Sequence, residues 1–326
     1  MIVERAAGTS FEPLIQLENL ELAFSHKRGA LAHRTMRALD GVSLTIGRGE
    51  VVGVVGESGS GKTTLGKATL RLYQPKGRIL YRGADLAALS ERALLPLRRD
   101  LQMVFQDPLS SFNPRFRMGN SLVLPLLLHD IAQTKSEALR LAVELVQSVG
   151  LQADCCERFP HQLSGGQLQR VAIARAIGIR PKLIVADEAV SKLDVSVRAQ
   201  VLNLIRRLNR ENGVSFMFIT HDLAVARFLS NRVAVMYRGR IVELGDTDRI
   251  FSNPQHPYTR SLLNARKQAI ATEGQGAPDD RVDAGNGCNF ACACPRRQSR
   301  CLEHPPVLAP LTTDHSVACF YSAHVP

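Results

Sequence analysis

Gly56-Glu57-Ser58-Gly59-Ser60-Gly61-Lys62-Thr63-Thr64 is the stretch that decides the fold of this chain. It matches the pattern G-x-x-x-x-G-K-[ST], in which glycines let successive backbone N–H groups converge on phosphates at the positive end of a helix. Before it, residues 49–55 end in an apolar, valine-rich run typical of a buried parallel strand. After it, Leu65, Ala68 and Leu72 share one face of a predicted helix that Pro75 ends. We therefore expect all nine residues to bind a nucleoside triphosphate in an α/β fold.

An acidic pair follows a second predicted strand. Residues 183–186 are apolar, and Asp187 and Glu188 come directly after them, at the strand end that opens on the nucleotide. Beside a phosphate loop, Asp187 is expected to hold Mg²⁺ and Glu188 to orient and deprotonate the attacking water. Lys62 would bridge the terminal phosphates, and the Thr63 hydroxyl would be a second Mg²⁺ ligand.

Length and composition limit the classes of protein to consider. A chain of 326 residues with 45% hydrophobic content can form one large α/β domain and a smaller appendage. Residues 1–13 lack the apolar region of a signal peptide, and Pro125 interrupts the longest apolar stretch, so we expect neither export nor a membrane span. The net charge of +11 suits nucleic acid or anionic lipid, but the basic residues are scattered and tryptophan is absent. We therefore expect no nucleic-acid partner.

The order of motifs along nearly the whole chain resembles the ATP-binding subunits of ABC transporters. Leu163-Ser164-Gly165-Gly166-Gln167, where Ser164 can cap a helix, is that family's LSGGQ signature. The resemblance implies an ABC-type P-loop ATPase domain over residues 1–262, with an inserted helical subdomain at about 107–162. A small cysteine-rich tail, residues 263–326, would follow.

The resemblance also assigns roles to single residues. Gln106 would be the Q-loop glutamine, with a role in catalysis and as a Mg²⁺ ligand, and His221 would be the histidine that senses the γ-phosphate. Phe24 would stack on adenine. The resemblance implies that further residues bind nucleotide. They are Asp194 in the D-loop, and Ser164, Gly165, Gly166 and Gln167 in the signature.

The family's ATP sites are composite, because a second helix N-terminus must enclose the γ-phosphate from the opposite side. The signature residues of this chain would therefore serve the ATP of a partner, a paralogous ATP-binding subunit or a second copy. Two departures from the family pattern lie beside the catalytic glutamate. Ala189-Val190 replaces a common Pro-Thr, and Lys192 replaces an alanine in the D-loop that crosses the dimer, which leaves the coupling of the two sites open.

Residues 105–115, 194–201 and 254–263 are similar to the dipeptide, oligopeptide and nickel importers. This branch implies a peripheral subunit at the cytoplasmic face of the inner membrane, working with two transmembrane permease subunits and an extracytoplasmic solute-binding protein. Peptide uptake is the function that we expect, and nickel uptake is the alternative.

Two readings from other classes are disfavoured. An ABC ATPase acting on nucleic acid would carry a coiled-coil arm, for which residues 106–163 are too few. An iron-sulfur redox protein with a vestigial ATPase would not need the intact set Lys62, Asp187, Glu188 and His221.

Five of the seven cysteines follow Gly287. In a reducing cytosol disulfides are disfavoured, so Cys288, Cys294, Cys301 and Cys319 suggest a metal. Their spacing leaves zinc open, although the lack of C-x₂-C pairs argues against a zinc ribbon. Resemblance to the tail of peptide-importer ATPases implies a [4Fe-4S] cluster. Residues 271–286 are predicted to be a linker, and Cys155, Cys156 and Cys292 receive no role.

Overall fold

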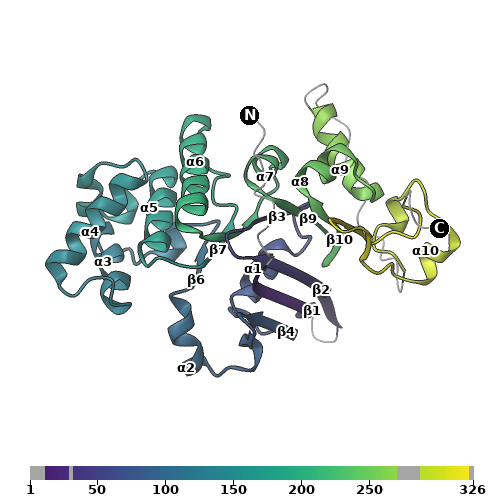
Figure 1. Cartoon of the computed structure of the whole chain (residues 1–326), viewed down its shortest axis with the longest axis horizontal. Helices are drawn as coiled ribbons and strands as arrows, with labels where there is room; N and C mark the ends of the chain where they lie inside the picture. Colours follow the sequence, from purple (N-terminus) through teal and green to yellow (C-terminus); the bar gives the residue numbers. More distant parts are fainter. Residues whose placement is uncertain (1–11, 29–31, 270–286, 323–326) are drawn as a thin grey trace.

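The computed structural model describes residues 12–28, 32–269 and 287–322. These residues form two sheets with helices around them (Figure 1). The larger sheet has eight strands in the order β11-β12-β10-β9-β3-β8-β7-β6, and the smaller has four in the order β2-β1-β4-β5. The α/β fold class expected from the sequence is confirmed.

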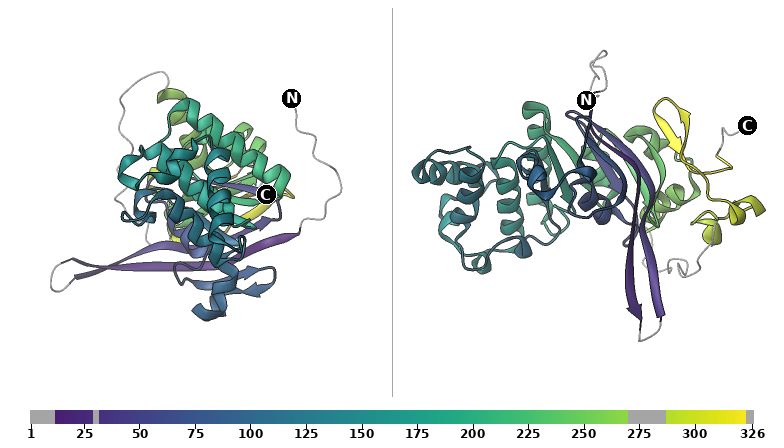
Figure 2. Two further views of the ribbon diagram at one scale, coloured as in Figure 1. Left: turned by 90° about the vertical axis from the view of Figure 1, so that its left-hand side faces the viewer. Right: turned by 90° about the horizontal axis from the view of Figure 1, so that it is seen from below.

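The bounds of the strands are as follows. They are β1 Pro13–Arg28, β2 Ala32–Gly47, β3 Val51–Val55, β4 Lys76–Tyr81, β5 Ala84–Asp85, β6 Leu101–Val104, β7 Leu183–Asp187, β8 Ser215–Ile219, β9 Arg232–Tyr237, β10 Arg240–Asp246, β11 Ala309–Thr312 and β12 His315–Val317. Strands β1 and β2 form a long hairpin that projects from the body of the molecule (Figure 2).

The helices come from the segments between these strands. The α-helices are α1 Lys62–Thr69, α2 Glu91–Leu94, α3 Met118–Leu128, α4 Lys135–Ser148, α5 Gly165–Gly178, α6 Val195–Asn212, α7 Leu223–Leu229, α8 Thr247–Ser252, α9 Pro257–Ala269 and α10 Ser299–Glu303. The 3₁₀ turns are η1 Leu86–Ala88, η2 Leu95–Arg98, η3 Leu109–Ser111, η4 Ala153–Glu157, η5 Pro160–Gln162 and η6 Ala291–Ala293.

The centre of the large sheet is parallel and apolar on both faces. Strand β3 pairs in parallel with β8 and β9, and β7 pairs in parallel with β8 and β6. Successive side chains of a strand point to opposite faces, so Ile184 and Ala186 enter the core beneath the helices, while Leu183 and Val185 enter the core shared with the small sheet. Two hydrophobic cores therefore hold the central strands from both sides.

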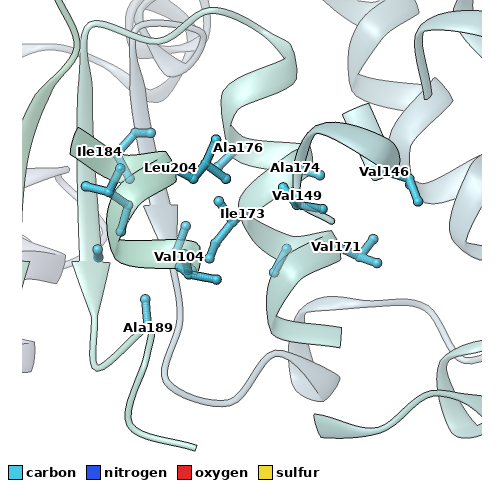
Figure 3. Packing of buried hydrophobic residues seen from close by; sticks show 14 of the residues in the cluster. Val104, Val146, Val149, Val171, Ile173, Ala174, Ala176, Ile184, Ala189 and Leu204 are labelled. Atoms are coloured by element: carbon cyan, nitrogen blue, oxygen red, sulfur yellow. The ribbon is translucent and has the colours of Figure 1, made fainter. Parts of the chain in front are cut away.

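The core beneath the helices joins the sheet to the segment between β6 and β7. Helix α5 lies in its middle and packs against α3 and α4 on one side and against the sheet on the other (Figure 1). Figure 3 shows Ile173 and Ala176 of α5 together with Val104 of β6 and Ile184 of β7. The expected helical subdomain at about 107–162 contains α3, α4 and three of the 3₁₀ turns. This packing sets the position of the signature helix.

One detail of the phosphate-loop helix differs from the sequence expectation. Helix α1 ends at Thr69, because Arg71 adopts a left-handed conformation with φ of 55°. Leu65 and Ala68 are fully buried as expected, but Leu72 lies beyond the helix and is 44% exposed. The prediction that Leu72 lies on the buried face of this helix is therefore wrong.

The C-terminal segment is built into the large sheet. Strand β12 pairs antiparallel with β10, through Glu243 with Val317 and Gly245 with His315. Helix α9 runs across residues 262 and 263, where the boundary of the tail was expected, so a division there cuts a continuous helix. The predicted linker 271–286 lies outside the described residues. Among the residues that the structure does describe, no helix is both long and apolar enough to cross a membrane.

Candidate active site

The phosphate loop connects the end of β3 to the start of α1. Gly56 and Gly61 have positive φ, and a Cβ at either position would lie within 2.4 Å of a backbone carbonyl oxygen, Met236 O for Gly56 and Ala38 O for Gly61. Only glycine fits so close to β9 and β2. Helix α1 begins at Lys62, so its free N–H groups face the loop.

Lys62 is 6% exposed and folds back over the loop. Its ammonium group donates to Gly56 O at 2.8 Å and Glu57 O at 2.6 Å. Burial lowers the pKa of Lys62, and the nearby carboxylates of Glu188 and Asp187 oppose that shift. Two backbone carbonyl oxygens of the phosphate loop thus hold the Lys62 ammonium group in place.

Thr63 and Asp187 meet across the loop. The Thr63 hydroxyl donates to Asp187 Oδ1 at 3.0 Å, although the two residues are 124 positions apart. Burial raises the pKa of Asp187, the hydrogen bond from Thr63 lowers it, and the neighbouring Glu188 raises it again. A hydroxyl beside a buried carboxylate at a phosphate loop is an oxygen donor set of the kind that Mg²⁺ prefers.

Glu188 lies between two polar partners from distant parts of the chain. Gln106 donates its amide N–H to Glu188 Oε2 at 2.8 Å, and His221 Nδ1 lies 3.1 Å from Glu188 Oε1. The Glu188 backbone is left-handed, with φ of 47°, and its N–H donates to Ile219 O of β8. The structure thus brings together Gln106, Glu188 and His221 beside the Thr63–Asp187 pair.

The signature residues lie apart from the phosphate loop of their own chain. Ser164 Oγ accepts from Gln167 N at 3.2 Å, and Gln167 Oε1 accepts from Ser164 N at 3.0 Å, so a capping box starts α5 as expected. Ser164, Gly165 and Asp194 are all exposed, the last at the start of α6. A Cβ at Gly166 would lie 3.3 Å from the side chain of Leu193, in the segment before Asp194. These groups are accessible to another molecule.

Phe24 lies in β1 opposite Met36 of β2. Its ring packs edge-on against Tyr73, with 5.5 Å between centroids, and the Lys67 ammonium lies 5.4 Å from the Tyr73 ring. The predicted stacking of Phe24 on adenine stays a prediction.

The four cysteines of the predicted metal site line one cavity in the tail. Burial raises the pKa of Cys288 to about 11, and the proximity of Cys301, Cys294 and Cys319 adds to the rise. Within residues 12–28, 32–269 and 287–322, no three histidine, cysteine, aspartate or glutamate side chains form a group that could hold a metal ion. Cys292 is exposed and lies outside the cavity.

The vicinal pair Cys155-Cys156 is buried in the helical region. Burial raises the pKa of both thiols, to about 11 for Cys156. A buried thiol that stays protonated is a poor nucleophile, so the structure gives no reason to assign either cysteine a role.

One contact of the phosphate loop was not foreseen from the sequence. The hydroxyl of Tyr258 accepts a hydrogen bond from Glu57 N at 3.0 Å, across 201 positions of the chain. Residues 254–263 are typical of one branch of importers, but nothing in their sequence pattern predicts a contact with the phosphate loop.

Comparisons with known proteins agree with this architecture. Residues 39–191 match the model of the ABC transporter family, and residues 242–301 match that of the oligopeptide/dipeptide transporter C-terminal region. Among solved structures, the dimeric ATP-binding cassette MJ0796 bound to ADP and phosphate superposes with a TM-score of 0.65 and 31% identity. That match covers 72% of this chain and 98% of the cassette.

Several relatives have names that include their transported solute. The chain is 41% identical to a Bacillus subtilis protein provisionally named the oligopeptide transport ATP-binding protein YkfD, over 94% of this chain and 95% of that protein. It is 45% identical to a Brucella ovis protein provisionally named a peptide import ATP-binding protein, over 87% of this chain and 92% of the relative. It is also 46% identical to the glutathione import ATP-binding protein GsiA of Salmonella paratyphi A, over 81% of this chain and 42% of GsiA.

These relatives are matched over most of this chain, and the two matched family models span the phosphate loop, the acidic pair and part of the C-terminal region. The chain belongs to the ABC transporter family of ATP-binding proteins and carries the C-terminal region of its oligopeptide/dipeptide transporters.

Proposed function

We propose that this chain is the ATP-hydrolysing subunit of an ABC importer that takes up peptides. The observation that carries the proposal is the group of Gln106, Glu188 and His221, joined within 3.1 Å beside the phosphate loop. The names of the relatives support peptides as the transported solute. The matched C-terminal region supports the same branch of the family.

The phosphate loop would bind the triphosphate of ATP through its backbone N–H groups and Lys62. Phosphate oxygens are stronger acceptors than the carbonyls of Gly56 and Glu57, so the ammonium group of Lys62 would move from these carbonyls to the terminal phosphates. Bound Mg²⁺ would neutralise phosphate charge, and Thr63 and Asp187 are the residues that would hold it, with Gln106 nearby.

Glu188 would accept a proton from the water that attacks the γ-phosphorus in line. As the new P–O bond forms, the bond to the β–γ bridging oxygen breaks, and ADP and phosphate result. Gln106 and His221 fix both carboxylate oxygens of Glu188, and His221 is positioned to exchange its contact with Glu188 for one with the γ-phosphate. Most of the catalysis would come from positioning and charge stabilisation.

The exposed signature residues Ser164 and Gly165 support a composite site, in which they contact ATP bound to a second cassette. Asp194 would lie at the same interface, and Gly166 and Gln167 would complete it. The partner is a paralogous ATP-binding subunit or a second copy of this chain. The dimeric cassette among the similar structures supports such a pairing.

The remaining partners follow from the importer family. We propose two transmembrane permease subunits and an extracytoplasmic solute-binding protein, with this chain attached to the cytoplasmic face of the inner membrane. We also propose a division into an ATP-binding domain, residues 1–262, and a C-terminal region, residues 263–326, with α9 running continuously across the boundary. The helical subdomain at about 107–162 would contact the permeases.

Uptake by reconstituted vesicles tests the proposal. The vesicles would contain this chain, two permease subunits, a partner cassette and a solute-binding protein. We expect ATP-dependent accumulation of labelled dipeptides or oligopeptides with this chain and none with Glu188→Gln. Accumulation of ⁶³Ni²⁺ instead of peptide would identify the nickel importer and overturn the peptide assignment.

The tail would hold a [4Fe-4S] cluster through Cys288, Cys294, Cys301 and Cys319. Four thiols around one cavity are a ligand set for either an iron-sulfur cluster or zinc. The lack of C-x₂-C pairs among these cysteines argues against a zinc ribbon. Burial raises the pKa of Cys288, Cys294 and Cys319, and the resident metal would stabilise their thiolates against this effect.

Anaerobically purified protein tests the metal. We expect about four irons and four sulfides per chain, lost on replacing Cys301 with serine but kept in the matched control Cys292→Ser. Stoichiometric zinc without sulfide in iron-replete protein would overturn the cluster, and a protease-resistant tail without any metal would overturn the site.

A further inference from the structure

Tyr258 contacts the phosphate loop from the side of the C-terminal region. It is 2% exposed at the start of α9, and its hydroxyl accepts the hydrogen bond from Glu57 N at 3.0 Å. The carbonyl of Glu57 accepts from the Lys62 ammonium at 2.6 Å. One residue of the loop is therefore held by Tyr258 through its N–H and bonded to the catalytic lysine through its C=O.

The ring of Tyr258 is clamped between two other aromatic side chains. Its centroid lies 4.5 Å from that of Tyr237, at the end of β9, and 5.5 Å from that of Phe290. Phe290 also meets the Tyr237 ring edge-on at 5.4 Å. Because Phe290 lies between Cys288 and Cys294, the cysteine-bearing segment sets where the Tyr258 hydroxyl points.

A second connection runs beside the first. Asn289 Nδ2 donates to Arg238 O at 3.1 Å, in the turn between β9 and β10. The next residue of that turn, Gly239, donates its N–H to Ser60 O of the phosphate loop at 2.9 Å. Adjacent residues of the tail, Asn289 and Phe290, thus reach two points of the loop through two independent sets of contacts.

We infer that Tyr258 is a positioning residue for the phosphate loop, and that Asn289 and Phe290 of the cysteine-bearing tail hold it and the β9–β10 turn in place. This inference rests on the proposed ATP site. The loop binds phosphates with backbone N–H groups, so its affinity depends on how well its conformation is fixed before the nucleotide arrives. The contacts of Tyr258 and Gly239 fix the backbone at Glu57 and Ser60.

Tyr258→Phe removes the hydroxyl and keeps the ring between Tyr237 and Phe290. The loss of one hydrogen-bond acceptor at Glu57 N should raise the dissociation constant for ATP by about 3- to 10-fold. In the assembled transporter KM for ATP should rise by a similar factor, with kcat within about twofold of wild type, because Tyr258 does not touch the reacting atoms.

Tyr81→Phe is the matched control. Tyr81 lies in β4 of the small sheet and is as buried as Tyr258. Its hydroxyl donates to Asp100 Oδ2 at 2.6 Å. This variant should lose stability and bind ATP like wild type. Hydrogen exchange of the backbone N–H groups of residues 56–61 adds a local measurement. The exchange should be faster in Tyr258→Phe and unchanged in Tyr81→Phe.

Asn289→Ala tests the part played by the tail, since it keeps every cysteine. We expect weaker ATP binding here too, by about 2- to 5-fold, and unchanged affinity would overturn the role of the tail.

Wild-type affinity and exchange in Tyr258→Phe, or an equal loss in Tyr81→Phe, would overturn the positioning role of Tyr258. A wild-type chain that binds no ATP would instead refute the proposed function.

Discussion

Glu188 shows how a single residue can be both strained and well held. A left-handed conformation is unfavourable for a residue with a side chain, by about 1 to 3 kcal/mol. The hydrogen bond from its N–H to Ile219 O fixes that conformation at the end of β7, and Gln106 and His221 fix the carboxylate. Such a constrained carboxylate can receive a proton with little reorganisation.

Glu188→Gln should separate binding from hydrolysis. Glutamine keeps the shape and the contact with His221 but cannot act as a base, so ATP binding should persist while hydrolysis slows by about 10² to 10⁴. Equilibrium binding and single-turnover hydrolysis measure the two effects. Lys62→Ala, in contrast, should weaken binding itself, and near-normal turnover in Glu188→Gln would show that another group activates the water.

His256 should make stability depend on pH. Burial lowers its pKa to about 4, against the opposing effect of the Glu243 carboxylate, whereas in the unfolded chain its pKa is near the ordinary histidine value of 6.5. Between these two values the unfolded state binds a proton that the folded state does not, so the free energy of unfolding falls as the pH drops. The full free energy of unfolding is present above pH 6.5, and roughly 3 kcal/mol of it is lost by about pH 4.

Urea titrations at pH 4 to 7 measure this contribution. His256→Asn keeps an acceptor for Tyr258 N, so it should fold and show a flatter dependence of stability on pH than wild type. The exposed His161→Asn is the control and should keep the wild-type slope. Equal slopes in wild type and His256→Asn would show that His256 is not the group responsible.

At the scale of elements, α5 connects the signature to the segment after Gln106. Arg175 donates to Ser111 O at 2.7 Å and to Ser111 Oγ at 2.9 Å, and its guanidinium lies 4.4 Å from the Phe112 ring. Gln169 donates to Phe105 O at 3.3 Å. A movement of residues 105–112 would therefore be transmitted to the helix that carries the signature.

Arg175→Ala should both destabilise the protein and weaken this connection. Two charged hydrogen bonds to a partly buried segment are lost, and we expect a decrease of about 2 to 3 kcal/mol in the free energy of unfolding. Stimulation of ATP hydrolysis by the permeases should decrease as well. Arg140→Ala breaks only an exposed pair with Glu144 and should change neither quantity.

The elements also show which features can be predicted from sequence. The phosphate loop, the strand before Asp187 and the capped helix after Ser164 rest on local patterns, and each is present. Leu72 was misplaced because a left-handed Arg71 ends α1 without a glycine or proline to mark it. The pairing of β12 with β10 and the bond between Tyr258 and Glu57 join distant segments, and such contacts leave no local trace in composition or periodicity.

At the scale of the whole molecule, the proposed composite site means that one chain carries two halves of different ATP sites. Activity should therefore depend on concentration, because Ser164 of one cassette must complete the site of the other. We expect a dilute preparation of this chain to hydrolyse ATP poorly and to gain activity when its paralogue is added. Light scattering under assay conditions would report the oligomeric state, and full activity from monomers would exclude a composite site.

The pairing of β12 with β10 also affects how the protein can be handled. Strand β12 covers the outer edge of β10, so a version cut before Ala309 would leave the backbone N–H and C=O groups of β10 unpaired. An uncovered strand edge next to an apolar core is a template for aggregation between molecules. Strands β11 and β12 thus cover the edge of β10, and a shortened version prepared for crystallisation should retain them.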